Sequence, residues 1–258
     1  MGAMKTDLLF DPFGATWSDV REAAWAAEGE GFDGVWLYDH LAGSVHRESR
    51  VLEAWTTLTA IATAVPRIAI GPMVLNVANR PAGTLGVMAA TLQEVSEGRL
   101  LLGLGAGGGR ETPYAAEQRA FDRPVPGDAT RRSAVEAAVA TLRSVWSGDV
   151  GGVSGFLRPD PPPPIVIGGF GPKMAELAGR VADGVNLPSG PQLARLLETA
   201  RAAVTAAGGD PSAFIVTVSS DLRPQALERL EALGVDRVVA FVGAPSAEGV
   251  RRLTPRRP

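Results

Sequence analysis

Residues 34–43 read GVWLYDHLAG, and the order of residue types in this stretch decides the fold. Residues 35–38 form a continuous apolar run, which is typical of a strand buried on both faces in a parallel sheet. Asp39 and His40 follow at once, where this strand is expected to end. His40 is one of only two histidines in 258 residues, the other being His46. The stretch predicts a buried strand followed by two polar residues at the edge of the sheet, where a functional site can form.

The same alternation of buried strands and amphipathic helices extends in both directions. Thr16 precedes Asp19 by three residues, a capping-box spacing that predicts the start of a helix. Strands are predicted at 6–10, 35–38, 67–76, 99–107, 164–169, 184–187, 214–219 and 237–242. Helices are predicted from Thr16 to the GFDG at 31–34, around 51–62 and 85–95, and at 129–147, 172–182, 192–207, 225–233 and 246–253. Eight such pairs predict an α/β fold with one (β/α)8 TIM barrel over residues 1–258, in which 122–127 and 148–164 are loops.

The composition excludes several classes of function. A formal net charge of −3 gives no reason to bind nucleic acid, and no apolar run predicts a membrane span or a signal peptide. The absence of cysteine excludes disulfides, thiolate metal sites and cysteine nucleophiles. No metal-ligand spacing and no G-x-S-x-G pattern occur. We expect a cytoplasmic protein with no metal, in which Met4 is the native start and residues 1–3 are additions.

The pair Asp39 and His40 is the first candidate for catalysis. In a barrel of this kind the active site lies at the C-terminal ends of the strands, where both residues are expected. An imidazole exchanges protons near neutral pH, so His40 suits an acid or base. The alternative is that Asp39 caps the next helix beside a histidine that only packs. For His46, farther along the loop, a packing role is expected.

Two glycine-rich segments are candidate binding sites. GLGAGG (103–108) matches the dinucleotide fingerprint, but that motif needs a helix directly after it, and Pro113 with no apolar stripe argues against one. Glycines that let a flat ligand approach the backbone at the barrel rim are the favoured interpretation. IGGFGPKMAELAG (167–179) is a glycine turn that leads into a helix, which predicts an anion site. The alternative is a plain tight connection.

Taken together, these stretches resemble the bacterial luciferase-like flavin and deazaflavin oxidoreductases. The matching segments occur in the family order and span roughly residues 7–190. They are EGFDGVWLYDHL (30–41), IGPMVLN (70–76), NRPAG (79–83), SEGRLLLGLGAGG (96–108) and PIVIGGFGPKMAELAGRVADGVN (164–186). The Asp-His pair is similar to that of the branch that uses the deazaflavin coenzyme F420.

The resemblance implies a coenzyme ring across the barrel mouth and assigns residues to it. His40 is implied as the acid or base, with Asp39 beside it in a catalytic and coenzyme-binding role. Met73 and Val74 match a bulge that backs the ring and is often joined by a non-proline cis peptide. The other implied coenzyme contacts are Asn76, Ala106 and Gly107 at the ring and tail, and Gly169, Phe170, Gly171 and Ser189 at the phosphate.

The resemblance also has departures, and it leaves rival functions open. Some deazaflavin dehydrogenases carry tryptophan where this chain has Ser44 and glutamate near Gly108. These departures argue against sugar-phosphate chemistry and leave open whether the proton-transfer pair is complete. The expected function is F420-dependent hydride transfer to or from a small organic substrate. The alternatives are a reduced-FMN-dependent monooxygenase supplied by a reductase, and a flavin-binding barrel without turnover. A Schiff-base aldolase is disfavoured because the chain has only two lysines. Members of the family are often homodimers.

Overall fold

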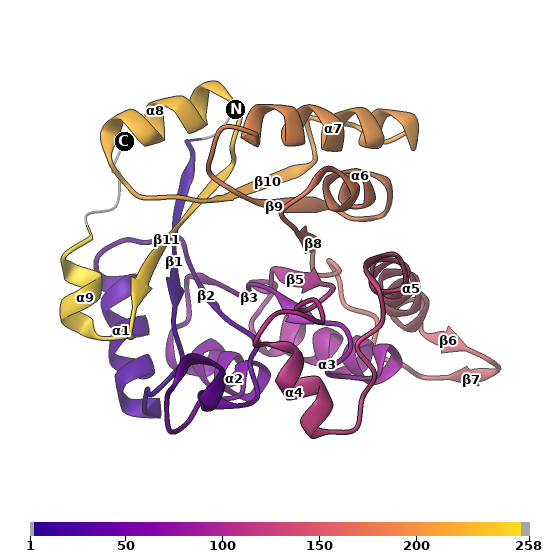
Figure 1. Cartoon of the computed structure of the whole chain (residues 1–258), viewed down its shortest axis with the longest axis horizontal. Coiled ribbons are helices and arrows are strands. Elements are labelled where there is room, and N and C mark those ends of the chain that lie inside the picture. The colour runs from indigo at the N-terminus through magenta and orange to yellow at the C-terminus, as the bar shows by residue number, and fades with distance from the viewer. Residues whose placement is uncertain (1–2, 254–258) are drawn as a thin grey trace.

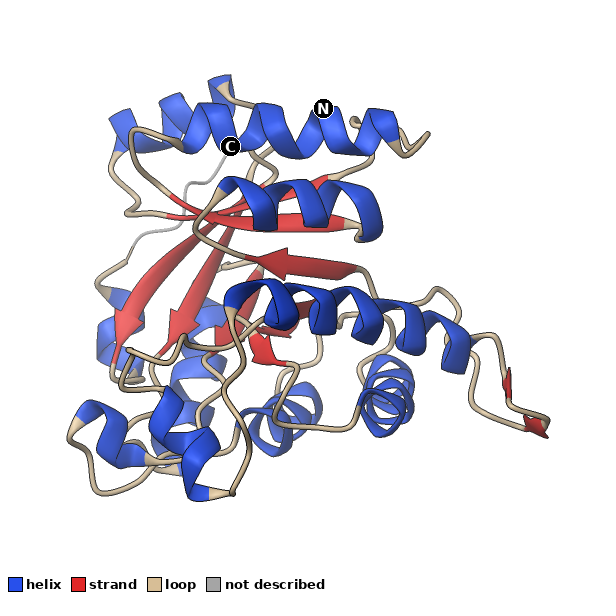
Figure 2. Cartoon of the chain, turned by 45° about the vertical axis from the view of Figure 1, so that its right-hand side comes forward, coloured by secondary structure: helices blue, strands red, loops and turns tan. Residues whose placement is uncertain are grey.

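A computed structural model describes residues 3–253, and in it parallel strands form a ring that helices surround (Figures 1 and 2). Residues 1, 2 and 254–258 lie outside the described part, and so does most of the segment expected to be an addition. The strands are β1 (Lys5–Phe10), β2 (Gly34–Leu37), β3 (Ala69–Pro72), β4 (Leu75–Asn76), β5 (Leu102–Gly105), β6 (Asp149–Val150), β7 (Val153–Ser154), β8 (Ile165–Gly168), β9 (Gly184–Pro188), β10 (Ile215–Ser219) and β11 (Arg237–Gly243). The helices are α1 (Trp17–Gly29), α2 (Ala54–Ala64), α3 (Ala82–Val95), α4 (Ala115–Ala120), α5 (Asp128–Trp146), α6 (Pro172–Val181), α7 (Leu193–Ala206), α8 (Pro224–Ala232) and α9 (Ala247–Arg251), with a short 3-10 helix η1 (Gly43–His46).

The predicted barrel is confirmed, and its ring of strands is nearly closed. The strands of the main sheet run parallel in the order β3-β2-β1-β11-β10-β9-β8-β5-β4. Strands β3 and β4 are the two halves of the predicted third strand. A single parallel bridge between Ile70 and Leu100 spans the remaining gap, where the Ile70 amide donates to the Arg99 carbonyl at 3.0 Å. The C-terminal ends of all these strands therefore face one end of the barrel.

The local signals explain where two elements begin and break. Helix α1 starts at the predicted capping box, in which Thr16 and Asp19 each accept a hydrogen bond from the other's backbone amide. The third strand breaks at the Met73–Val74 peptide, which is cis. Gly71 and Pro72 still pair with β2 inside β3, so the break comes directly after them.

Three elements were not predicted from the sequence. The segment 148–164, expected to be a loop, contains the antiparallel hairpin of β6 and β7, which projects from the body of the molecule (Figures 1 and 2). Helix α4 lies between β5 and α5, and η1 follows β2. Helix α4 has no apolar stripe to reveal it, because its buried residues include Glu117 and Gln118. Hydrophobic periodicity detects only elements that bury apolar side chains.

The barrel interior is filled by side chains in layers. At its N-terminal end the buried Asp7 carboxylate accepts hydrogen bonds from Arg237, through Nε and Nη2 at 2.6 Å each, and from the indole of Trp36 at 2.9 Å. Above this network lie Met73 and Val239, which form a buried cluster with Leu9 and Trp36. Side chains therefore fill the interior at the N-terminal ends of the strands. Within residues 3–253, no helix combines the length and apolar character needed to cross a membrane.

Candidate active site

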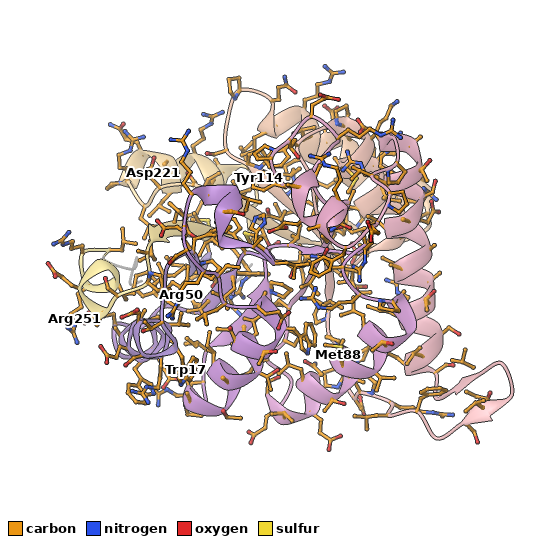
Figure 3. All side chains as sticks on the ribbon, turned by 60° about the horizontal axis from the view of Figure 1, so that its bottom comes forward. Trp17, Arg50, Met88, Tyr114, Asp221 and Arg251 are labelled. Atoms are coloured by element: carbon orange, nitrogen blue, oxygen red, sulfur yellow. The ribbon has the colours of Figure 1, made fainter. Side chains whose placement is uncertain are left out.

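His40 lies just beyond the C-terminal end of β2, in a cluster of aromatic rings. Its ring centroid is 5.0 Å from that of Phe13, 4.8 Å from that of Tyr114 and 6.3 Å from that of Tyr38. His46 stacks on Phe13 at 4.2 Å, and its Nε2 is 3.3 Å from the Tyr114 hydroxyl. Figure 3 brings the lower side of Figure 1 forward and labels Tyr114 there. The two histidines therefore share one cluster, although His46 is exposed.

A carboxylate that the sequence did not single out contacts His40. Oε2 of Glu117 is 3.3 Å from Nδ1 of His40. The Glu117 side chain is 4% exposed and the His40 side chain 16%. Burial acts to raise the pKa of Glu117, but hydrogen bonds from the His40 ring and from the amides of Leu41 and Ala42 outweigh it and lower the pKa. Glu117 is therefore an anion at neutral pH.

The Asp39 carboxylate contacts residues at and after the end of β4. It is paired with Arg80 and also accepts hydrogen bonds from the Asn79 side chain at 3.0 Å and the Asn76 amide at 2.9 Å. Its side chain is fully buried. Asp39 does not cap α2 either, because the Glu53 side chain accepts hydrogen bonds from the first amides of that helix. These contacts tie the exit of β2 to the exit of β4, and a catalytic or coenzyme-binding role of Asp39 stays a prediction.

An apolar floor closes the barrel beneath the mouth. Tyr38 and Val74 are partly exposed and pack on the buried interior cluster. Burial and the neighbouring Asp11 carboxylate raise the pKa of Tyr38 above 10.0, so its phenol stays neutral. Phe241 of β11 is 55% exposed, and its ring lies 6.2 Å from that of Tyr38. A flat, largely apolar group fits this floor, with the His40 imidazole beside it.

Several glycines of 103–108 allow close contacts within the chain. A Cβ on Gly103 would lie 2.0 Å from the Pro72 carbonyl oxygen, and one on Gly105 would lie 2.5 Å from Val74. Gly107 has a φ of +68°, and its Cβ would meet the Asn76 side chain at 2.5 Å. Asn76 and Gly107 are thus neighbours at the rim. No helix follows the segment directly, as the sequence predicts, since α4 begins only at Ala115.

The predicted phosphate turn lies between β8 and α6. Gly171 is the N-cap of α6, and Pro172 is its first residue. Phe170 is 86% exposed, and a Cβ on Gly171 would meet nothing within 4 Å. The Ser189 amide donates to the Ser219 carbonyl at 3.0 Å, which places Ser189 just beyond β9 on the same side of the barrel. The turn is open and exposes the start of a ten-residue helix.

Comparisons with known proteins show the family to which the chain belongs. The sequence pattern of the family described as "Luciferase-like monooxygenase" matches residues 5–236. The chain belongs to the luciferase-like monooxygenase family.

Two named relatives of this luciferase-like protein are a reductase and a dehydrogenase. It is 32% identical over 170 residues to 5,10-methylenetetrahydromethanopterin reductase from Methanolobus tindarius, covering 64% of this chain and 48% of that protein. It is 30% identical over 175 residues to an F420-dependent glucose-6-phosphate dehydrogenase from Beutenbergia cavernae, covering 64% of this chain and 50% of that one. The chain thus spans about half the length of the curated relatives it matches.

A solved structure shares the fold of this luciferase-like chain over its whole length. It is an F420-dependent secondary alcohol dehydrogenase in complex with an F420-acetone adduct, with a TM-score of 0.82 and 18% sequence identity. The match covers 96% of each chain. This likeness supports the barrel fold, in which His40 follows the C-terminal end of β2.

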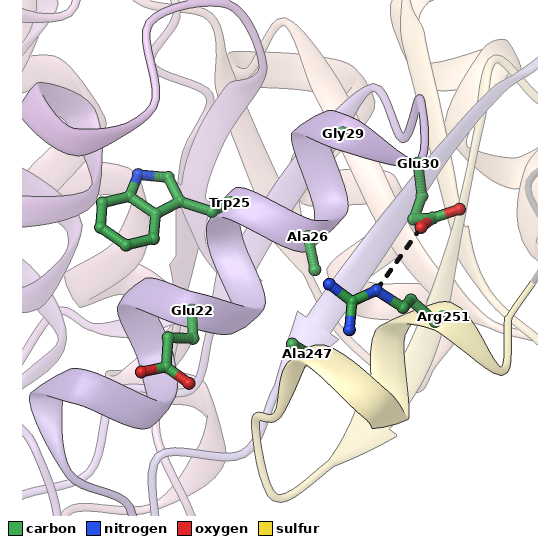
Figure 4. A pocket seen from close by; sticks show the side chains of 7 residues that line it. All are labelled: Glu22, Trp25, Ala26, Gly29, Glu30, Ala247 and Arg251. Atoms are coloured by element: carbon green, nitrogen blue, oxygen red, sulfur yellow. Dashed lines mark ion pairs between the residues drawn. The ribbon is translucent and has the colours of Figure 1, made fainter.

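Three residues of the luciferase-like site were missed from the sequence: Glu117, Tyr114 and Arg80. No spacing links Glu117 to His40, because the two are 77 positions apart. Arg80 lies in the quoted segment NRPAG, so its place after the third strand was the one available signal. Two grooves lie away from His40. One of about 510 Å³ runs between α1 and α9, where Trp25 and the ion pair of Arg251 with Glu30 line it (Figure 4). Another of about 500 Å³ lies at the opposite end of the barrel, beside Arg237 and Arg99.

Proposed function

We propose that the chain is a coenzyme F420-dependent oxidoreductase that moves a hydride between the deazaflavin and a small organic substrate. The observation that carries the proposal is the position of His40, a partly exposed imidazole at the C-terminal end of β2 beside the apolar floor. The F420-dependent activity named for the relative from Beutenbergia cavernae supports the choice of coenzyme.

The residues present fit a flat coenzyme ring. Tyr38 and Val74 offer an apolar surface beneath it, and Met73 supports this surface from below. Asn76, Ala106 and Gly107 would border the ring at the exits of β4 and β5. The turn Gly169–Gly171, with Ser189 nearby, would hold the phosphate, because a helix N-terminus presents amide donors to an anion. These assignments follow the family resemblance and the shape of the mouth.

When bound, the deazaflavin supplies the hydride acceptor or donor. Oxidation of a substrate hydroxyl also releases a proton from oxygen, and reduction of a carbonyl consumes one. His40 accepts or delivers this proton, since an imidazole has one nitrogen that can accept a proton and one that can donate it. The floor and the aromatic rings around His40 orient the substrate and limit the access of water. Glu117 remains charged behind the imidazole.

A reduced-FMN-dependent monooxygenase is the second candidate, favoured by the description of the family itself. Both candidates need a flat ring over the same floor, so the fold does not separate them. A flavin-binding barrel without turnover is the third. A homodimer, a cytoplasmic location and a reductase that supplies the coenzyme belong to the same proposal and rest on the resemblance.

Equilibrium binding of the purified protein to the deazaflavin and to FMN, measured side by side, tests the proposal. We expect tight binding of the deazaflavin and substrate-dependent change of its absorbance, with no oxygen consumption. Preference for FMN with an oxygenated product or hydrogen peroxide would instead establish the monooxygenase. Binding of either ring with no turnover across alcohols, ketones and aldehydes would favour the non-catalytic barrel.

A further inference from the structure

We propose that Glu117 is the positioning residue of His40: it holds the ring proton on Nδ1 and so makes Nε2 the atom that exchanges a proton with the substrate. The tautomer follows from the geometry of the chain alone. Only its catalytic consequence rests on the proposed function.

The first step is that the Glu117 carboxylate is fixed in place. Its Oε1 accepts the amide protons of Leu41 and Ala42 at 2.9 and 3.1 Å, and these two residues directly follow His40. Oε2 is left to contact Nδ1 of His40 at 3.3 Å. One buried carboxylate thus holds both the backbone after His40 and one edge of its ring.

The second step is the chemistry of the contact. An ionised carboxylate only accepts hydrogen bonds, so the ring nitrogen facing it must carry a proton. In a neutral imidazole with the proton on Nδ1, the lone pair lies on Nε2. Within residues 3–253, no side chain or backbone group forms a hydrogen bond with Nε2 of His40. Nε2 is therefore the basic atom, and after taking up a proton it becomes the acidic one.

The third step explains why the acidic partner comes from α4. Gly108 lies in the rim segment after β5, where a longer side chain could otherwise reach toward His40. A Cβ on Gly108 would lie 2.4 Å from Oγ1 of Thr112 and 2.8 Å from Cβ of Tyr114, so that position has no room for a side chain. Tyr114 itself packs against His40. The carboxylate that contacts His40 comes instead from Glu117 of α4, three residues after Tyr114.

Nitrogen NMR of the coenzyme-free protein tests the tautomer directly. The chain has two histidines, so a protein labelled with ¹⁵N-histidine gives two imidazoles, and His46→Ala leaves only that of His40. We expect a protonated Nδ1 and an unprotonated Nε2 for His40 at about pH 8.5, well above the usual imidazole pKa. A protonated Nε2 in both wild type and His46→Ala would overturn the proposal, whatever the behaviour of other variants.

Glu117→Gln supplies the sharper comparison. The amide oxygen can still accept from Leu41 and Ala42, which turns the amide NH₂ toward Nδ1 of His40. Nδ1 must then accept, and the proton moves to Nε2. Glu111→Gln, an equal change at an exposed residue on the loop before α4, should leave the tautomer unchanged. An unchanged tautomer in a folded Glu117→Gln protein would overturn the proposal.

Kinetics separate this inference from the proposed function. With a substrate in hand, Glu117→Gln should lower kcat by at least about tenfold, with coenzyme affinity changed by less than about twofold. The upper limit is about 10⁴-fold, the largest usual effect of losing the acid or base itself. If Glu117→Gln inverts the tautomer but the protein shows no turnover in any deazaflavin assay, the proposed function is contradicted. The role of Glu117 in setting the tautomer of His40 would still hold. A normal kcat despite an inverted tautomer would refute the assignment of Nε2.

Discussion

Arg80 forms a bidentate ion pair with Asp39, the residue that precedes the catalytic candidate His40. Nη2 of Arg80 is 2.9 Å from Oδ1 of Asp39, and Nη1 is 3.0 Å from Oδ2. The Asp39 side chain is fully buried and that of Arg80 is 13% exposed. The same guanidinium also contacts Glu53, the N-cap of α2. This pair therefore fixes the backbone from which His40 projects.

Removal of Arg80 should destabilise the fold strongly. Arg80→Ala leaves the buried Asp39 carboxylate without its counter-charge, which costs about 3–5 kcal/mol. Arg80→Lys should recover only part of this, since an ammonium does not match a carboxylate at two points. The midpoint of urea unfolding reports the change. As a control, Arg180→Ala breaks the half-exposed pair with Glu136 and should cost at most about 1 kcal/mol. Equal losses in the two variants would contradict the anchoring role.

Acid should remove a contribution of Glu117 to stability. Its pKa in the folded protein lies below the ordinary value of 4.5, so the folded state favours the charged form. That stabilisation is fully present above about pH 5.5 and is lost as the pH falls through 4.5 to the lowered pKa. We expect the difference in unfolding free energy between wild type and Glu117→Gln to shrink over this range, with Glu111→Gln as the control. A difference that stays constant down to about pH 3 would show that Glu117 gains nothing from its contacts.

Two glycine substitutions should change the stability of the protein in opposite directions. Gly103→Ala brings a methyl group within 2.0 Å of the Pro72 carbonyl oxygen, so neighbouring strands must shift, at a cost of about 1–3 kcal/mol or more. Gly83 lies in α3 with open space around its Cβ position. Gly83→Ala should stabilise the protein by about 0.4–1 kcal/mol because the unfolded chain loses freedom. Thermal unfolding of both variants measures these effects. If Gly103→Ala left the thermal stability unchanged, the conclusion that Gly103 is needed for close packing would be contradicted.

His40→Ala should leave the fold and coenzyme binding nearly intact. Its turnover should fall about 10²- to 10⁴-fold, the usual contribution of a positioned acid or base. His46→Ala is the matched control and should be close to silent, although His46 stacks on Phe13 in the same cluster. Steady-state kinetics with titration of the coenzyme distinguish the two. Full turnover in His40→Ala with every substrate would make His40 a packing residue.

Gly171→Asp should abolish coenzyme binding in a protein that still folds. The backbone there is extended, with φ of −140°, and the Cβ position is open, so the substitution brings no clash within the chain. The added carboxylate repels an anion at the start of α6. Gly171→Ala is the control for the loss of glycine. Fluorescence titration with the deazaflavin measures the affinity. Equal affinity in wild type and Gly171→Asp would exclude the turn as the phosphate site.

The sequence by itself determined the barrel and much of its rim. Continuous apolar strands alternate with helices that carry one apolar stripe. Both patterns can be recognised in short segments, because the spacing of apolar residues follows the geometry of the strand or helix that contains them. The capping box at Thr16 and the exit of His40 from β2 follow from residues a few positions apart. The break at Met73–Val74 came from the resemblance, and the structure places it there.

Only the tertiary structure decided the partners of the polar residues. Asp39 meets Arg80 and His40 meets Glu117, pairs separated by 41 and 77 positions, and Asp7 meets Arg237 from the far end of the chain. Helix α4 was not predicted from the sequence because it buries Glu117 and Gln118 in place of an apolar stripe. Apolar burial is non-directional and leaves a periodic trace in the sequence. Hydrogen bonds and ion pairs depend on the distance and angle between particular atoms, which only the assembled barrel sets.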